Sequence, residues 1–151
     1  MLTVNNLIGF GAGGADDAHL YWRIRLTAPN GSYIFTIADL EMRANVGGED
    51  QCTGGTAFAI GSTAGYEAYK AFGGDPGQWS YSRAVIGDFL GYQFLAPVSV
   101  KQLSIRGLNG TYPIGSFVLE HSDLGVVYVP VAEWTNVASY WLDNNVNLFN
   151  V

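Results

Sequence analysis

The stretch Ala71–Ser80, AFGGDPGQWS, is the part of the sequence that best indicates the fold class. Its paired glycines and its Asp-Pro-Gly sequence indicate a tight turn, and Trp79 is the apolar residue that closes the loop. Two apolar runs follow, IGDFLGYQF at 86–94 and APVSV at 96–100. Both contain the aromatic and β-branched residues that favour strands. We therefore predict a glycine loop, an aromatic strand, a turn at Ala96–Pro97 and a second strand.

A two-residue alternation of apolar and other side chains recurs along the chain. Trp22, Ile24 and Leu26 share one parity, which predicts a half-buried strand that begins at Tyr21. One helical turn is expected at 67–71. Further strands are expected at 34–37, 40–43, 57–60, 98–106, 117–122 and 126–131.

Short strands separated by turn signals favour one all-β domain, folded as a jelly-roll β-sandwich. The apolar positions change parity between Val100 and Leu103, which predicts a bulge at Lys101–Gln102. The expected core includes Trp22, Ile24, Phe94, Val100, Ile105, Phe117 and Leu119.

These pieces, in this order, resemble the discoidin family, also called coagulation factor 5/8 type C, of galactose-binding-like β-sandwiches. That family shows Ala-Phe-Asp-Gly and then Trp, followed by an aromatic-glycine strand and Pro-Val-x-Val. Matching pieces also lie at Tyr21–Ile24, Ile37–Arg43 and Phe117–Gly125. The resemblance covers about Tyr21 to Trp134, and it implies a jelly roll that binds rather than catalyses.

Composition restricts the functional class. A chain of 151 residues favours one domain, and a net charge of −6 with only seven scattered Lys and Arg argues against nucleic acid as a partner. Charged residues make up only 13%, which suits a surface partly covered by other subunits. Cys52 is the only cysteine and forms neither an internal disulfide nor a thiolate zinc site. We expect no signal peptide and no membrane insertion.

The two ends of the chain differ from its centre. Residues 1–20 include the glycine-rich run GFGAGG at 9–14, so we interpret them as a flexible arm that docks on a neighbouring subunit. The run fits the pattern G-x-G-x-x-G, but no helical periodicity follows it, which argues against a dinucleotide site. The asparagine-rich residues 135–151 are expected to form a tail that docks on the domain or on a neighbour. The apolar anchors of the arm are Leu7, Ile8 and Phe10.

Asp75 is the leading candidate for a metal ligand. The resemblance implies a calcium ion near this loop, held by Asp75 and Glu133, because calcium accepts several oxygens in flexible geometry. The chain departs from the family at Gly73, where the family carries Asp, and at Gln78, where it often carries Thr. A structural Asp-Pro-Gly turn without any cofactor is the alternative.

The two histidines do not indicate catalysis. His19 and His121 are the only ones in the chain, and neither lies in a recognisable arrangement with a nucleophile and an orienting acid. His121 precedes Ser122 and Asp123, but neighbours on a strand point to opposite faces. We therefore expect structural histidines and a protein that is not an enzyme.

Aromatic residues gather near the glycine loop at 71–80, called here the signature loop, and form the candidate ligand-binding set. Aromatic rings stack on sugar rings while a few polar groups fix the orientation. The alternative is that Trp79 plugs the end of the sandwich and that the tyrosines pack against neighbouring subunits. The candidate residues are Tyr66, Tyr69, Trp79, Tyr81 and Arg83.

The chain looks like the stand-alone discoidin-like proteins found among bacteriophage virion components. This resemblance implies a structural or decoration protein of the capsid, tail or fibre, made in the host cytoplasm and located in the virion. Its expected partners are other virion proteins and copies of itself. The alternative is a carbohydrate-binding module that attaches a particle to a cell-surface glycan.

Overall fold

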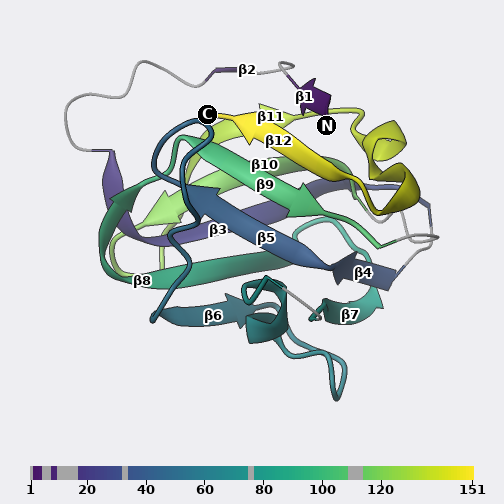
Figure 1. The fold of residues 1–151 in the computed structure, drawn as a ribbon. Helices are drawn as coiled ribbons and strands as arrows, with labels where there is room; N and C mark the ends of the chain where they lie inside the picture. Colours follow the sequence, from purple (N-terminus) through teal and green to yellow (C-terminus); the bar gives the residue numbers. More distant parts are fainter. Residues whose placement is uncertain (1, 5–7, 10–16, 32–33, 75–76, 109–113) are drawn as a thin grey trace.

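The computed structural model describes residues 2–4, 8–9, 17–31, 34–74, 77–108 and 114–151 (Figure 1). Over these residues the chain forms twelve strands, two short 3-10 helices and no α-helix. The strands gather in two large sheets and one two-stranded sheet. The expected all-β class is confirmed.

The larger sheet has six strands, and every pairing in it is antiparallel. β3 lies inside this sheet, where Trp22, Ile24 and Leu26 are buried and alternate with partly exposed residues. This two-residue period turns one face of the strand toward the core. The strand order is β2 (Ile8–Gly9), β11 (Val129–Trp134), β10 (Ile114–Ser122), β3 (Ala18–Pro29), β8 (Phe89–Ser99) and β6 (Thr56–Ala59).

The second sheet has four strands, in the order β1 (Leu2–Val4), β12 (Val146–Asn150), β9 (Gln102–Arg106) and β5 (Asp39–Arg43). β1 runs parallel to β12, whereas the other pairings are antiparallel. A separate antiparallel pair joins β4 (Ile34–Ile37) to β7 (Trp79–Arg83). The 3-10 helices are η1 (Ala68–Ala71) and η2 (Ala138–Asn144).

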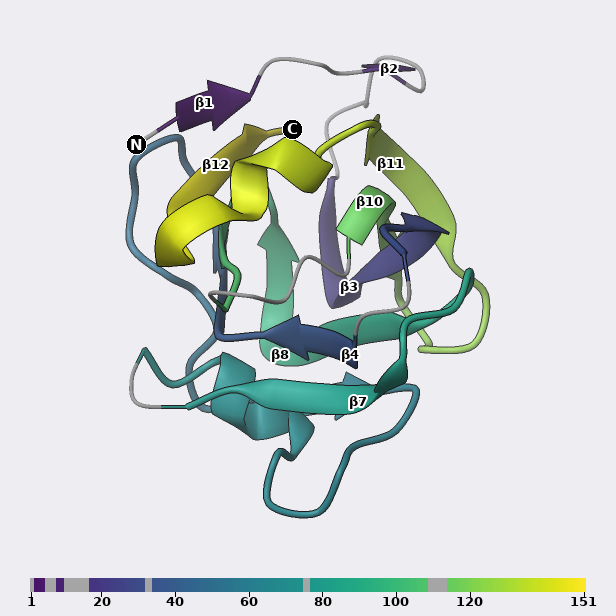
Figure 2. The same cartoon turned by 90° about the vertical axis from the view of Figure 1, so that its right-hand side faces the viewer.

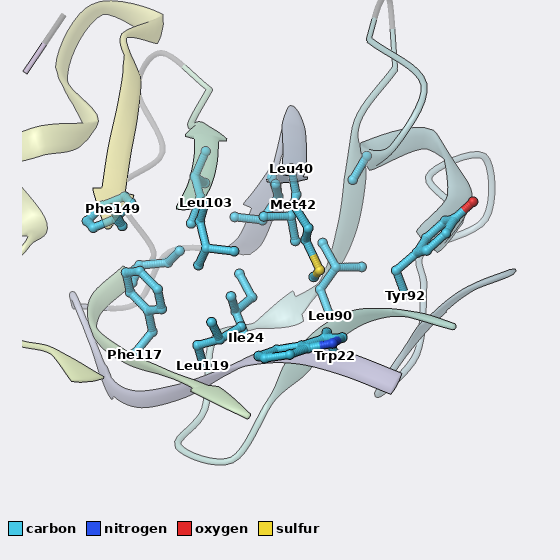
Figure 3. Close-up of a cluster of buried hydrophobic side chains, with 14 of the residues drawn as sticks. Trp22, Ile24, Leu40, Met42, Leu90, Tyr92, Leu103, Phe117, Leu119 and Phe149 are labelled. Carbon is cyan, nitrogen blue, oxygen red and sulfur yellow. The ribbon is translucent and has the colours of Figure 1, made fainter. Parts of the chain in front are cut away.

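The core lies between the two large sheets. Figure 3 shows Ile24 and Leu119 of the six-stranded sheet on one side, and Leu40, Met42 and Leu103 of the four-stranded sheet on the other. All seven residues expected in the core are buried, each at most 4% exposed. The alternation in the sequence therefore identified the inward face of these strands correctly.

The change of parity near Val100 has a different cause from the expected bulge. β8 ends at Ser99 in the six-stranded sheet, and β9 begins at Gln102 in the four-stranded sheet. The chain therefore crosses from one sheet to the other at 100–101. Because the two sheets face each other, the residues that point into the core have one parity in β8 and the other in β9. The predicted bulge at Lys101–Gln102 was therefore wrong.

The expected turn at Ala96–Pro97 was also wrong, because β8 continues through it. Tyr21 pairs with Gln93 and His19 pairs with Val98, so four residues of β8 lie opposite a single residue of β3. The proline occupies this irregular part of the ladder, where its missing N–H breaks no regular pairing. The signals of a turn here mark a bulge within one strand.

Both ends of the chain join the sandwich. β3 begins at Ala18, three residues before the expected start at Tyr21. β12 lies inside the four-stranded sheet, between β1 and β9, so residues 135–151 dock on the domain as part of its core. At the other end, β1 lies beside β12 and β2 beside β11 (Figure 2).

We predict that Phe149→Ala strongly destabilises the fold. The Phe149 ring is fully buried and lies 5.0 Å from the Phe117 ring and 5.5 Å from the Trp134 ring, between their centroids. Truncating such a ring costs about 3–5 kcal/mol of unfolding free energy, measured by urea denaturation. Val146→Ala on the same strand is the control, since Val146 is 39% exposed. A Phe149→Ala variant as stable as the control would contradict a core role for β12.

Candidate functional site

Two of the candidate aromatic residues are exposed on one turn. Tyr66 precedes η1 and Tyr69 lies within it, with 41% and 63% of their surfaces exposed. The turn is held by main-chain bonds from Tyr66 N to Thr63 O at 2.8 Å and from Ser80 N to Tyr66 O at 3.2 Å. Lys70 Nζ donates to Gly65 O at 2.6 Å. The two rings are therefore presented to solvent by an ordered turn.

Trp79 is fully buried and does not join that surface. Its Nε1 donates to Gly61 O at 2.8 Å, and its ring meets the edge of the Phe35 ring at 4.7 Å between centroids. No face of the indole is left for a ligand, which agrees with the interpretation of Trp79 as a plug. Replacing a buried ring of this kind with alanine typically destabilises a protein.

Tyr81 and Arg83 lie farther along β7. Tyr81 is half-buried and covers Gly61, where an added Cβ would come within 2.4 Å of the ring. Gly61 is therefore required for this ring position. Arg83 is exposed at the end of β7 and pairs in register with Ile34. Tyr66 and Tyr69 are thus both exposed, just before and within η1, while Tyr81 packs inward.

The expected calcium ligands receive no support from their positions. Asp75 lies outside the described residues. Glu133 lies in β11 of the six-stranded sheet, in register with Val118 on one side and Ile8 on the other. Within the part of the chain that the structure describes, no three His, Cys, Asp or Glu side chains form a group suited to a metal ion.

Acidic groups gather instead around β5. Burial, followed by the nearby charges of Glu41 and Asp50, raises the pKa of Asp39 to about 6, although Arg106 and a hydrogen bond from Gly74 oppose the shift. The bond from Gly74 ties the signature loop to β5.

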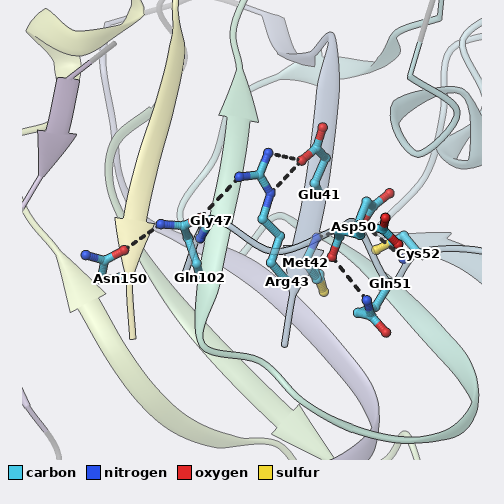
Figure 4. A network of polar contacts seen from close by, with 10 residues as sticks. Glu41, Met42, Arg43, Gly47, Asp50, Gln51, Cys52, Gln102 and Asn150 are labelled. Carbon is cyan, nitrogen blue, oxygen red and sulfur yellow. Dashed lines mark hydrogen bonds and ion pairs between the residues drawn. The ribbon is translucent and has the colours of Figure 1, made fainter. Parts of the chain in front are cut away.

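Asp50 fixes the segment that follows β5. Its Oδ1 accepts bonds from Met42 N at 3.1 Å and from Cys52 N at 3.0 Å (Figure 4). Cys52 is buried, and this burial raises the pKa of its thiol. These contacts give Asp50 a structural role, and the burial of Cys52 favours its protonated thiol.

The outer face of the four-stranded sheet carries a polar network that joins three strands. Arg43 bonds to Glu41 through Nε at 2.8 Å and to Gln102 Oε1 through Nη1 at 3.2 Å. Gln102 Nε2 donates in turn to Asn150 Oδ1 at 2.7 Å (Figure 4). Because these bonds link β5, β9 and β12, the network has a structural role.

The six-stranded sheet carries a second network that the sequence did not reveal. Glu120 is only 3% exposed, and it accepts bonds from Arg23 Nε and Arg25 Nε, both at 2.8 Å. The Arg23 guanidinium lies over the Tyr128 ring, 3.6 Å from its centroid, and 4.8 Å from that of Phe89. The bonds to both arginines lower the pKa of Glu120 against the effect of its burial.

The two histidines lie face to face. The rings of His19 and His121 stack with centroids 3.4 Å apart, and His19 Nδ1 donates to Asp123 Oδ1 at 2.8 Å. Burial and then the neighbouring His19 lower the pKa of His121. These contacts tie the start of the β10–β11 hairpin to β3 and are compatible with the expected structural role of the two histidines.

The expected arm residues lie at the sheet edges where the structure describes them. Leu7 and Phe10 lie outside the described residues, whereas Ile8 is in β2, opposite Glu133. In β1, Thr3 lies opposite Leu148 of β12. The arm therefore adds a short strand to each of the two large sheets.

Comparison with protein-family models, curated proteins and solved structures gives no match to this chain. The resemblance to the discoidin family thus stays a hypothesis. Within the described residues, none of the helices has the length and apolar character needed to cross a lipid bilayer.

We predict that Asp39→Asn stabilises the protein at neutral pH. The folded pKa of about 6 exceeds the ordinary 3.8, so the folded state binds the proton more tightly, and the charged carboxylate opposes folding above about pH 6. We expect a gain on the order of 1 kcal/mol at about pH 7.5, after allowance for solvent screening. The gain should vanish below about pH 4, where both states are protonated. Urea denaturation across this pH range measures it.

The exposed carboxylate of Glu49 supplies the matched control, Glu49→Gln. This variant removes the same charge from the same region, and we expect little change in stability with pH. A gain for Asp39→Asn that is equal at pH 4 and pH 7.5 would contradict a role for its charge.

Proposed function

We propose that the protein is a non-enzymatic structural component of a bacteriophage virion, built on a jelly-roll sandwich of the discoidin type and attached through its N-terminal arm. The observation that carries the proposal is the position of this arm. β1 and β2 extend the four-stranded and the six-stranded sheet at their outer edges, β12 and β11. Main-chain pairing at sheet edges is a general way of joining protein chains.

The surface of the sandwich also supports association. In the hairpin between β10 and β11, Leu124, Val126 and Val127 are 82%, 80% and 74% exposed. The hairpin is well anchored, because Ser122 Oγ accepts a bond from Gly125 N at 3.0 Å and Tyr128 stacks on Arg23. Exposed aliphatic residues that are held in place favour contact with another protein.

We predict that deleting residues 1–16 leaves the domain folded but prevents assembly. The deletion stops before Asp17 and keeps β3 and the core intact. Circular dichroism should show an unchanged β spectrum, while binding to purified particles or to sister subunits should fall at least tenfold, about 1.4 kcal/mol. Co-sedimentation and light scattering measure the binding. Undiminished assembly of the deleted chain would refute the role of the arm.

A carbohydrate-binding module is the second candidate function. The observation in its favour is the exposure of Tyr66 and Tyr69 on one ordered turn, three residues apart. Two aromatic rings with a nearby Lys70 suit a sugar, since the rings stack and the polar group orients it. In this function the module attaches the particle to a cell-surface glycan.

We predict a separation of binding from stability among the aromatic residues if this second function holds. Tyr66→Ala and Tyr69→Ala should each reduce binding on a glycan array about tenfold, with an unchanged melting temperature. Trp79→Ala should instead lose about 3–5 kcal/mol of stability with or without sugar. If Trp79→Ala instead keeps full stability and abolishes binding, Trp79 is the residue that stacks on the sugar and has no structural role.

A further inference from the structure

Two histidines pack together at one end of the sandwich, where β3 begins and the β10–β11 hairpin starts. The rings of His19 in β3 and His121 in β10 stack with their centroids 3.4 Å apart. Both rings also pack against Trp22, at 5.8 Å and 5.4 Å between centroids. The Trp22 ring is itself fixed, because its Nε1 donates to Val98 O of β8 at 2.9 Å. The histidine pair therefore lies against a buried and anchored side chain.

The two imidazoles differ in their hydrogen bonds. His19 Nδ1 donates to Asp123 Oδ1 at 2.8 Å, and a carboxylate accepts this bond whether the ring is neutral or charged. His121 Nδ1, by contrast, is buried and has no hydrogen-bond partner among the described residues. A charged imidazole carries an N–H on both ring nitrogens, so a charged His121 has a buried donor without an acceptor. Burying a charge in this way is unfavourable.

The charged groups around His121 come from several parts of the chain. His19 of β3 stacks on it, and Asp123 follows β10. Asp17 precedes β3 and is already held by Lys101 Nζ at 2.9 Å, while the β11 residue opposite His121 in the register is uncharged. Burial and then His19 lower the pKa of His121, against the attraction of Asp123 and Asp17. The side chain of Asp123 is 68% exposed, so water screens its attraction.

We propose that this histidine pair is an acid-sensitive latch: proton uptake separates the two rings and frees the start of the β10–β11 hairpin from the start of β3. While His121 is neutral, the stack and the bond from His19 to Asp123 hold the hairpin to β3. When both rings are charged, two like charges face each other and one of them is buried without a partner. Separation of the rings lets water solvate both charges and is therefore favoured in acid.

The pH range of opening follows from linkage. A histidine whose pKa is lower in the closed state than in the open state binds its proton more tightly when the latch is open. The latch therefore stays closed above about pH 6.5, the ordinary pKa of histidine, and opens progressively as the pH falls below that value. Asp39 in β5 acts in the opposite sense, since its raised pKa favours the folded state as the pH falls below about 6. Global stability combines both effects, so a local measurement is needed.

Hydrogen exchange at individual amides tests the latch in the full chain. The amides at 120–122 report on the start of the hairpin, and those of β9 report on the core. Between about pH 7.5 and pH 5.5 we expect protection at 120–122, corrected for the intrinsic exchange rate, to fall about tenfold. Protection in β9 should change by less than about twofold. In His121→Phe, which keeps an aromatic ring in the stack but binds no proton, protection at 120–122 should stay constant over this range.

Asp123→Asn is the matched control, because it keeps both imidazoles and an oxygen that accepts from His19. It removes an attraction that opposes opening, so we expect the loss of protection in acid to be at least as large as in the unmodified chain. Constant protection in the unmodified chain, an equal loss in His121→Phe, or no loss in Asp123→Asn would overturn the latch.

NMR titration of the imidazoles in the unmodified chain gives a second measurement that needs no variant. We expect His121 to titrate with a midpoint below about 6.5, whereas a midpoint at or above this value would refute the latch. The latch does not depend on the proposed function, although the part that it frees carries the exposed aliphatic residues of the hairpin tip.

Discussion

The aromatic cluster around Phe149 is the interaction on which the rest of the sandwich depends. Its ring contacts Phe117 of β10, Trp134 of β11 and Trp141 of η2, with centroids 5.0–5.9 Å apart. Phe149 belongs to one large sheet, whereas β10 and β11 belong to the other, so the cluster joins the two sheets at one side. It also holds β11 and β12 close together. These are also the two strands beside which β1 and β2 lie.

The outer faces of both sheets are stabilised by polar groups rather than left bare. Glu120 and Gln102 are buried on the outward sides of their strands, and each makes several hydrogen bonds. Burying a carboxylate or an amide without partners is expensive, so arginines and asparagine have to accompany them.

The sequence predicts local structure well, because alternation reports which face of a strand is buried. Together with the ordered pieces of the family resemblance, this alternation predicts that Trp22, Ile24 and Leu119 lie in the core. Alternation does not report which sheet a strand joins, and for this reason the crossing at 100–101 resembled a bulge. β12 was missed as a strand because Asn147, Leu148 and Phe149 are all buried. Asn147 and Phe149 share the inward face, where Asn147 donates to Tyr140 O of η2 at 2.8 Å. Leu148 is buried on the opposite face, so no apolar alternation is visible.

The candidate surfaces were only partly predictable for the same reason. A tyrosine in a glycine-rich loop is equally compatible with exposure and burial, and only the tertiary structure separates Tyr69 from Trp79. The arm shows the reverse situation. Its glycine content predicts a flexible segment and carries no signal of strand pairing. Strand pairing depends on the partner edge rather than on local composition, so only the tertiary structure shows β1 beside β12 and β2 beside β11.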